Sequence, residues 1–171
     1  MIKPQDILIL LKLVASPESH TSLSSLAFDV GVGLSEAHRS LDRASKARLY
    51  DPEQRKPVLA NLREFVIHGV PYLFAAERGE VTRGIPTSFA APPLNQHLRV
   101  PDLTSGEIPV WPSASGTAKG YALTPLYHSV PFAAQRDPAL YELLTLVDAL
   151  REGRARERNL AVKELEKRLS S

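Results

Sequence analysis

The placement of proline is the sequence feature that most limits how this chain can fold. Of its 14 prolines, nine lie between residues 70 and 137, whereas residues 1–69 hold four. Proline has no backbone N–H and clashes with the preceding helical turn, so long helices are excluded from the middle of the chain. The sequence therefore predicts an α+β, mainly α fold. We expect a helical domain over residues 1–69, and strands, coil and two C-terminal helices over residues 70–171.

Apolar periodicity places the first helix from about Pro4 to Ala15. Its main stripe recurs every three or four residues and comprises Ile7, Leu10, Leu11 and Val14. Leu8, Ile9 and Leu13 make the other faces apolar as well. A helix that is apolar on several faces is buried on more than one side. We expect a partner chain to cover the second side.

Three further helices are expected before residue 70, each with a capping or terminating signal. The first begins near Ser22, with Thr21 or Ser22 as its cap, and ends at Gly31. The second runs from Glu36 to about Arg48, with Ser35 as its cap. The third runs from Pro57 to His68, and Gly69 and Pro71 end it.

The middle of the chain contains two similar glycine-bounded phrases, Gly79–Ile85 and Gly116–Tyr121. We interpret them as two hairpin-like elements, the first formed by a strand at Tyr72–Ala75, a turn at 77–80 and a return over 81–85. After the second of these elements, we expect one helix that begins at Pro138 and ends at Gly153, and another over residues 155–169. Because the connection is short, the two are expected to pack antiparallel.

Residues 22–50 are expected to form a helix, a glycine turn and a second helix in succession. Leu26-Ala27, Gly31, Leu41-Asp42-Arg43 and Arg48-Leu49-Tyr50 are the residues that define it. In this arrangement the segment resembles the winged helix-turn-helix core of MarR-like bacterial transcriptional regulators. The resemblance implies that the second helix enters the DNA major groove. It also implies a basic β-hairpin, the wing, after Tyr50. This sequence instead leads through residues 51–57 toward another expected helix, so either the hairpin containing Arg78 and Arg83 replaces the wing or no wing is present.

The expected DNA contacts lie mainly on the helix that follows Ser35. A formal net charge of only +2 means that DNA binding requires a local cationic surface. The candidate residues are Ser35, Glu36, His38, Arg39, Arg43, Lys46 and Arg48, together with Arg78 and Arg83 on the expected hairpin. Arg39 suits a bidentate contact to guanine, whereas Arg43, Lys46 and Arg48 suit phosphates. The alternative is a solvated helix face whose arginines pair with Glu36 and Asp42.

Catalysis and metal binding find no support in the sequence. It has no cysteine, its five histidines lack the spacing of metal ligands, and no GxSxG, GxGxxG or phosphate-binding loop is present. We therefore expect no enzyme activity, no catalytic residue, no metal and no cofactor. The short apolar run Ile7–Leu11 is flanked by Asp6 and Lys12, and no run approaches the ~20 residues needed to span a membrane. The absence of cysteine fits a reducing cytoplasm.

Two functions remain. The first is a sequence-specific regulator of transcription, more specifically a repressor, that binds double-stranded DNA as a homodimer. The second is an antitoxin or adaptor that neutralises a partner protein, such as a toxin-like enzyme, through residues after 70 and retains autoregulatory DNA binding. An extended proline-rich segment would suit wrapping around such a partner.

Overall fold

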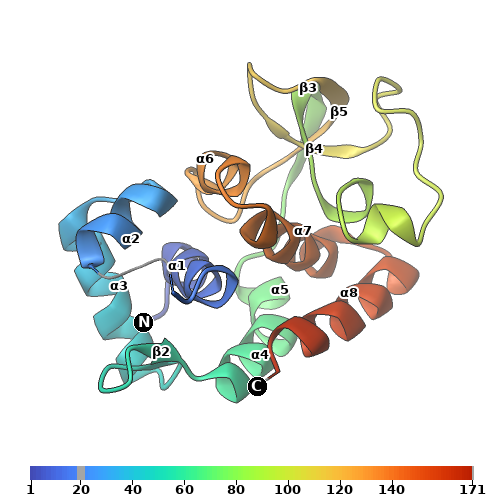
Figure 1. Ribbon diagram of the computed structural model, residues 1–171. Coiled ribbons are helices and arrows are strands. Elements are labelled where there is room, and N and C mark those ends of the chain that lie inside the picture. The colour runs from blue at the N-terminus through green and yellow to red at the C-terminus, as the bar shows by residue number, and fades with distance from the viewer. Residues whose placement is uncertain (19–21, 171) are drawn as a thin grey trace.

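The computed structural model describes residues 1–18 and 22–170 and combines helices with short strands (Figure 1). The helices are α1 (Pro4–Ala15), α2 (Leu23–Val30), α3 (Leu34–Lys46), α4 (Leu59–His68), α5 (Val70–Leu73), α6 (Val130–Gln135), α7 (Pro138–Glu152) and α8 (Ala155–Arg168). The strands are β1 (Tyr50–Asp51), β2 (Lys56–Pro57), β3 (Arg78–Pro86), β4 (Pro109–Pro112) and β5 (Ala118–Leu123), with short 3₁₀ turns η1 (Ser88–Ala90) and η2 (Leu94–Gln96). Helices at both ends and strands between them confirm the α+β class.

Helix α1 lies in the middle of the molecule, with α2 and α3 on one side of it and α7 on the other (Figure 1). Residues 7–11 are all fully buried, which confirms that this helix is covered on more than one side. The expectation that a partner chain is needed for the second side is wrong, because α7 of the same chain covers it. Two polar side chains, Asp6 and Lys12, are buried with these apolar residues.

Helix α2 begins and ends as its sequence predicts. The Ser22 hydroxyl accepts a hydrogen bond from the Ser25 N–H at 3.1 Å, so Ser22 is the cap. Thr21, the other expected cap, lies outside the described residues. Gly31 ends the helix with a φ of 71°, a left-handed conformation that glycine adopts without steric penalty.

Helix α3 starts two residues earlier than expected. Gly33 supplies the extended backbone at its N-cap, and Leu34 is the first helical residue. The expectation that Ser35 caps this helix is therefore wrong: Ser35 lies in its first turn. At the other end, Arg48 follows the helix with a φ of 63°, a conformation usually taken by glycine at this position.

A two-stranded antiparallel hairpin follows α3, where a direct lead into another helix was expected. Tyr50 pairs with Pro57 and Asp51 pairs with Lys56. The Asp51 carboxylate accepts hydrogen bonds from the N–H groups of Glu53 and Gln54, at 3.0 and 3.2 Å, and so closes the turn. Because Pro57 belongs to β2, α4 begins at Leu59 rather than at Pro57.

The middle of the chain forms one closed three-stranded barrel, not two hairpins. Strand β3 pairs antiparallel with both β4 and β5, and the parallel pairing of β4 with β5 closes the barrel. The two similar phrases of the sequence are therefore partner strands, with Val81 opposite Tyr121. The expected strand at 72–75 is also wrong, because Val70–Leu73 forms helix α5, with Pro71 in its first turn.

Glycine permits the close strand crossings of this small barrel. A Cβ atom at Gly120 would lie 1.9 Å from the carbonyl oxygen of Ile108, and one at Gly84 would lie 2.2 Å from that of Trp111. Contacts this short are impossible, so no other residue fits at either position without backbone movement. A small apolar cluster separate from the main core includes residues of β4, β5 and η1 and comprises Ala90, Ile108, Val110 and Ala118.

The C-terminal helices pack on one another and on the rest of the molecule. Helix α7 ends at Gly153 as expected, and α8 lies against it. The main hydrophobic core contains residues from Ile7 to Leu169, so the two units expected on either side of residue 70 share it. No helix in the described part of the chain is both long and apolar enough to cross a membrane.

Candidate nucleic-acid interface

Helix α3 presents one face to solvent and one to the core. Ala37, Ser40 and Ala44 face inward and are buried. The exposed positions begin in the first turn and continue to the end of the helix: Leu34, Ser35, His38, Arg39, Asp42 and Lys46. Most of the expected DNA-binding residues on this helix are therefore accessible.

Of the two arginines on α3, Arg39 and Arg43, Arg39 is the more exposed. Its side chain is 65% exposed, and its Nε donates to Glu36 Oε1 at 3.1 Å. The two terminal guanidinium nitrogens make no hydrogen bond to another described residue. They remain available for a second interaction.

Arg43 is not part of this exposed face. It donates to both carboxylate oxygens of the fully buried Asp6, from Nε at 2.9 Å and from a terminal nitrogen at 2.8 Å. The same terminal nitrogen lies 3.0 Å from Glu36. Only 14% of the Arg43 side chain is exposed. The expectation that Arg43 is free for phosphate contact is therefore wrong, because a bidentate ion pair ties it to α1.

Glu36 is held in its ionised form by three neighbours. Gln5 of α1 donates a hydrogen bond at 3.0 Å, and Arg43 and Arg39 add theirs. The hydrogen bond from Gln5, followed by those from the two arginines, outweighs the effect of burial and lowers the pKa of Glu36 to about 2. The first turn of α3 thus carries a carboxylate that is ionised at neutral pH and fixed in place by its hydrogen bonds.

Lys46 continues the exposed face at the C-terminal end of α3. Its ammonium lies 3.0 Å from the Asp42 carboxylate, and the two side chains are 78% and 56% exposed. An ion pair this exposed contributes little and breaks readily. Lys46 is therefore positioned as expected, and its charge can be shared with another partner.

The β1–β2 hairpin adds cations that were not among the expected contacts. Arg55 and Lys56 are both exposed on it, close to the exposed Arg48 that precedes it. Arg55 has a φ of 57°. Asp51 and Pro52 could have predicted this turn, since aspartate followed by proline often opens a type I turn.

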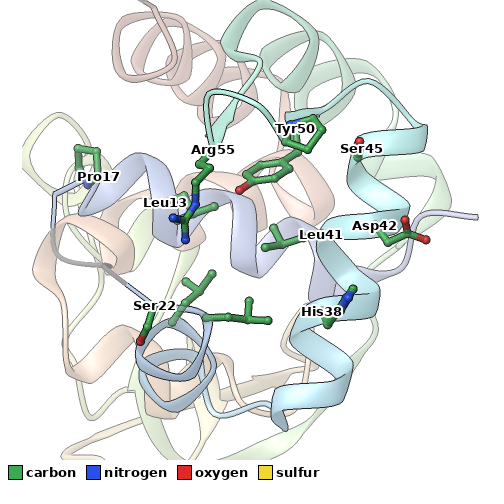
Figure 2. Close-up of a pocket in the computed structure, with 12 residues that line it drawn as sticks. Leu13, Pro17, Ser22, His38, Leu41, Asp42, Ser45, Tyr50 and Arg55 are labelled. Atoms are coloured by element: carbon green, nitrogen blue, oxygen red, sulfur yellow. The ribbon is translucent and has the colours of Figure 1, made fainter.

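A hollow of about 510 Å³ separates the hairpin from α3 (Figure 2). Figure 2 shows Arg55 extending from the hairpin toward Leu13 of α1, while His38 and Asp42 line the hollow from the side of α3. Beside Arg55 lies the phenol of Tyr50, whose pKa is raised by burial against the opposing effect of that cation. The hairpin arginine thus interacts with the phenol of Tyr50, over a hollow whose lining is both apolar and polar.

Arg78 and Arg83 do not join this surface. Both lie on β3, which Figure 1 places at the other end of the molecule from α3. Arg78 contacts Glu152 at 2.6 Å and stacks over the ring of Tyr121, 4.9 Å from its centre. The expectation that this pair replaces the wing is wrong, because their strand is part of the barrel.

Elsewhere the described residues contain no group of three or more histidine, aspartate or glutamate side chains arranged to hold a metal ion. The chain matches no protein-family model, no curated protein and no solved structure.

Proposed function

We propose that this chain is a helix-turn-helix protein that binds double-stranded DNA sequence-specifically, as a homodimer, and regulates transcription as a repressor. Helix α3 is its recognition helix, and the β1–β2 hairpin is a short wing. The observation that carries the proposal is the order helix, glycine turn, outward-facing helix, hairpin, with accessible Arg39 and Lys46 on the outward face. Such a helix inserts into the major groove, where its first turns reach base edges.

The backbone around the hairpin supports a cationic role. Among the described residues other than glycine, three have a positive φ, and two of these are Arg48 and Arg55. A left-handed conformation costs a side-chain-bearing residue about 1–2 kcal/mol, and glycine would avoid that cost. Arginine at both positions is consistent with two charges aimed at the phosphate backbone, because strain of this kind concentrates at functional sites.

The ion pairs of α3 do not oppose this role. The contacts of Arg39 with Glu36 and of Lys46 with Asp42 are solvent-exposed on the cationic side. Exposed pairs are worth about 0–1 kcal/mol, so a phosphate can compete with Asp42 for Lys46. Arg39 contacts Glu36 through Nε alone, which leaves its terminal nitrogens for a base edge.

A two-fold dimer is the form that this proposal requires. Two recognition helices spaced about 34 Å apart read a near-palindromic operator. Since α1 and α7 are buried within one chain, the dimer contact must use other surfaces. Tyr72 and Leu73 on α5 are 79% and 63% exposed, and adjacent apolar side chains this accessible are suited to a protein contact.

Duplex selection followed by electrophoretic shifts tests the proposal. The full chain is first used to select sites from a random duplex library. On the selected site, Arg39→Ala should cost about 1–3 kcal/mol and relax base preference at one position, whereas Lys46→Ala should weaken binding to all duplexes and reduce the salt slope by about 1.

Arg156→Ala provides the matched control. It removes the same charge from an exposed helix position on α8, away from α3, and should leave affinity and preference unchanged. Equal affinity of the unaltered chain for every duplex would contradict sequence-specific binding.

A further inference from the structure

A continuous chain of polar contacts runs from the buried end of α1 to the exposed tip of Arg39. Asp6 holds Arg43 through two hydrogen bonds, and Arg43 in turn donates to Glu36 at 3.0 Å. Gln5 donates to the same Glu36 oxygen, also at 3.0 Å. The other Glu36 oxygen accepts from Arg39 Nε at 3.1 Å.

We infer that Glu36 is a positioning residue that holds Arg39 in the orientation needed to read guanine, with Gln5 as its support. The inference rests on the proposed function and assigns a mechanism of specificity to the same surface. Glu36 engages only Nε of Arg39, so the two terminal nitrogens stay together at the solvent-facing end. Bidentate recognition of guanine O6 and N7 requires paired guanidinium donors held in a fixed plane.

The supports of Glu36 make it a rigid anchor. Its Oε2 receives two donors from residues that are themselves fixed, one on α1 and one paired with a fully buried carboxylate. Its Oε1 is thereby left oriented toward Arg39. An arginine held in advance loses less conformational freedom on binding, and its specificity improves accordingly.

The carboxylate also has an unfavourable effect on DNA binding in general. A fixed negative charge beside the duplex repels phosphates whatever the sequence. Glu36 therefore lowers nonspecific affinity while it raises selectivity for guanine. The two effects have opposite signs, which a purely structural role would not produce.

The test compares Glu36→Ala with Asp42→Ala in the full chain. Both remove one carboxylate from α3, but Asp42 pairs with Lys46, whereas Arg39 pairs with Glu36. Wild-type chain is used to select duplexes from a random library, and the position read by Arg39 is the one whose preference Arg39→Ala abolishes. Affinity for guanine and for the other bases at that position is then measured for each variant.

Glu36→Ala should reduce the guanine preference at that position about tenfold while strengthening binding to unrelated duplexes. Asp42→Ala should strengthen nonspecific binding similarly and leave the preference unchanged. Gln5→Ala, which changes no charge, should reduce the preference less than Glu36→Ala does. In the double variant Arg39→Ala, Glu36→Ala, the preference should fall no further than in Arg39→Ala alone.

Failure of the inference is distinguishable from failure of the proposed function. If the unaltered chain selects no sequence, the proposed function is overturned. If it selects a site and Glu36→Ala keeps the full guanine preference, or Arg39→Ala changes no preference, the inference alone is overturned. Thermal unfolding of Glu36→Ala distinguishes positioning of Arg39 from a general effect on the fold. If this variant loses binding to all duplexes and its Tm is lowered, the positioning role is contradicted as well. Asp6 keeps Arg43 paired in Glu36→Ala, so the variant is expected to fold.

Discussion

Arg43 and Lys46 carry the same charge on the same helix but are held in different environments. Arg43 is bound to a fully buried carboxylate on α1, whereas Lys46 contacts a carboxylate that is itself exposed. Environment, rather than position on the helical wheel, thus separates a stabilising cation from one that is available to a ligand.

Replacing Arg43 with alanine should destabilise the fold by about 3 kcal/mol, because it leaves Asp6 buried without a counter-charge. Lys46→Ala should change stability by less than about 0.5 kcal/mol. Urea unfolding followed by circular dichroism measures both. Similar midpoints for the two variants would contradict the role assigned to the buried pair.

Glu36 should make stability depend on pH in the acid range. Its folded-state pKa, about 2, lies below the ordinary value of 4.5, so its stabilisation is complete above about pH 4.5 and is lost as the pH falls toward 2. Solvent screening limits the effect to about 1 kcal/mol. Unfolding midpoints of the wild type and of Glu36→Gln between pH 2 and 6 should converge at the acid end. Parallel curves would contradict this pKa.

Arg48→Gly should stabilise the chain and weaken DNA binding together. Glycine accepts the observed φ of 63° without strain, which favours the variant by up to about 1 kcal/mol. The same change removes a cation from the proposed phosphate contacts, and the salt slope of binding should fall by about 1. Thermal unfolding and salt-dependent electrophoretic shifts report the two effects separately. Arg48→Lys keeps the charge and should retain the slope.

For the cations of α3, the sequence predicted which side chains are exposed better than it predicted which carboxylates they pair with. Arg39 and Lys46 are exposed as expected, while Arg43 is not, although it lies one turn from Arg39. Its partner is 37 residues away in the chain, and no local pattern could indicate which cation Asp6 would bind.

Among the elements, the three-stranded barrel depends most on residues without side chains. Gly120→Ala would place a Cβ atom 1.9 Å from the Ile108 carbonyl oxygen and should open the barrel, with a loss of several kcal/mol in unfolding free energy. Gly79→Ala is the matched control, because its Cβ would lie 3.3 Å from the Ala122 side chain and 3.9 Å from the nearest backbone atom, the Ala122 carbonyl oxygen. Tm by calorimetry should fall much further for the first variant than for the second.

Elements with a continuous apolar stripe were predictable, and those made by pairing were not. Helices α1, α2 and α7 begin or end at the expected proline, serine and glycine residues. The hairpin and barrel strands are two to nine residues long, and their partners are set by tertiary packing. The resemblance of the two glycine-bounded phrases was real, but it reflects strand pairing rather than repeated hairpins.

Across the whole molecule, one buried carboxylate joins the barrel to the helices. Asp148 of α7 accepts hydrogen bonds from Thr87 at 2.6 Å, from the Trp111 indole at 2.7 Å and from Arg151 at 2.8 Å. Burial raises the pKa of Asp148, partly offset by the nearby Arg151. Trp111 itself is fully buried.

Asp148→Ala should cost about 3–5 kcal/mol, because it strands the buried Arg151 charge and two further donors. Glu166→Ala, at an exposed position on α8, should be close to neutral. Chemical unfolding measures the free energy of unfolding of both variants. Equal values would contradict the role of Asp148 in connecting the barrel region to α7.

Native mass measures the proposed assembly directly. The chain should run at twice 18.8 kDa without DNA, and at that mass plus one duplex when a selected site is added. Leu73→Asp should shift the free protein toward 18.8 kDa if α5 forms the dimer contact. A monomer that binds the selected site with unchanged affinity would contradict the dimeric form of the proposal.

The expected boundary at residue 70 marks a change in composition, but one hydrophobic core contains residues from both sides of it. Ile7 and Leu169 belong to the same buried cluster, since α1 and α7 pack together. Composition reports where helices and strands alternate, whereas a shared core depends on contacts between distant segments.

Helix α1 is fastened at both ends, by Asp6 to α3 and by Lys12, 2.7 Å from Asp137, to the start of α7. Because these two ion pairs hold α1 to the helices on either side of it, the placement of the proposed recognition helix α3 relative to α7 is set through α1.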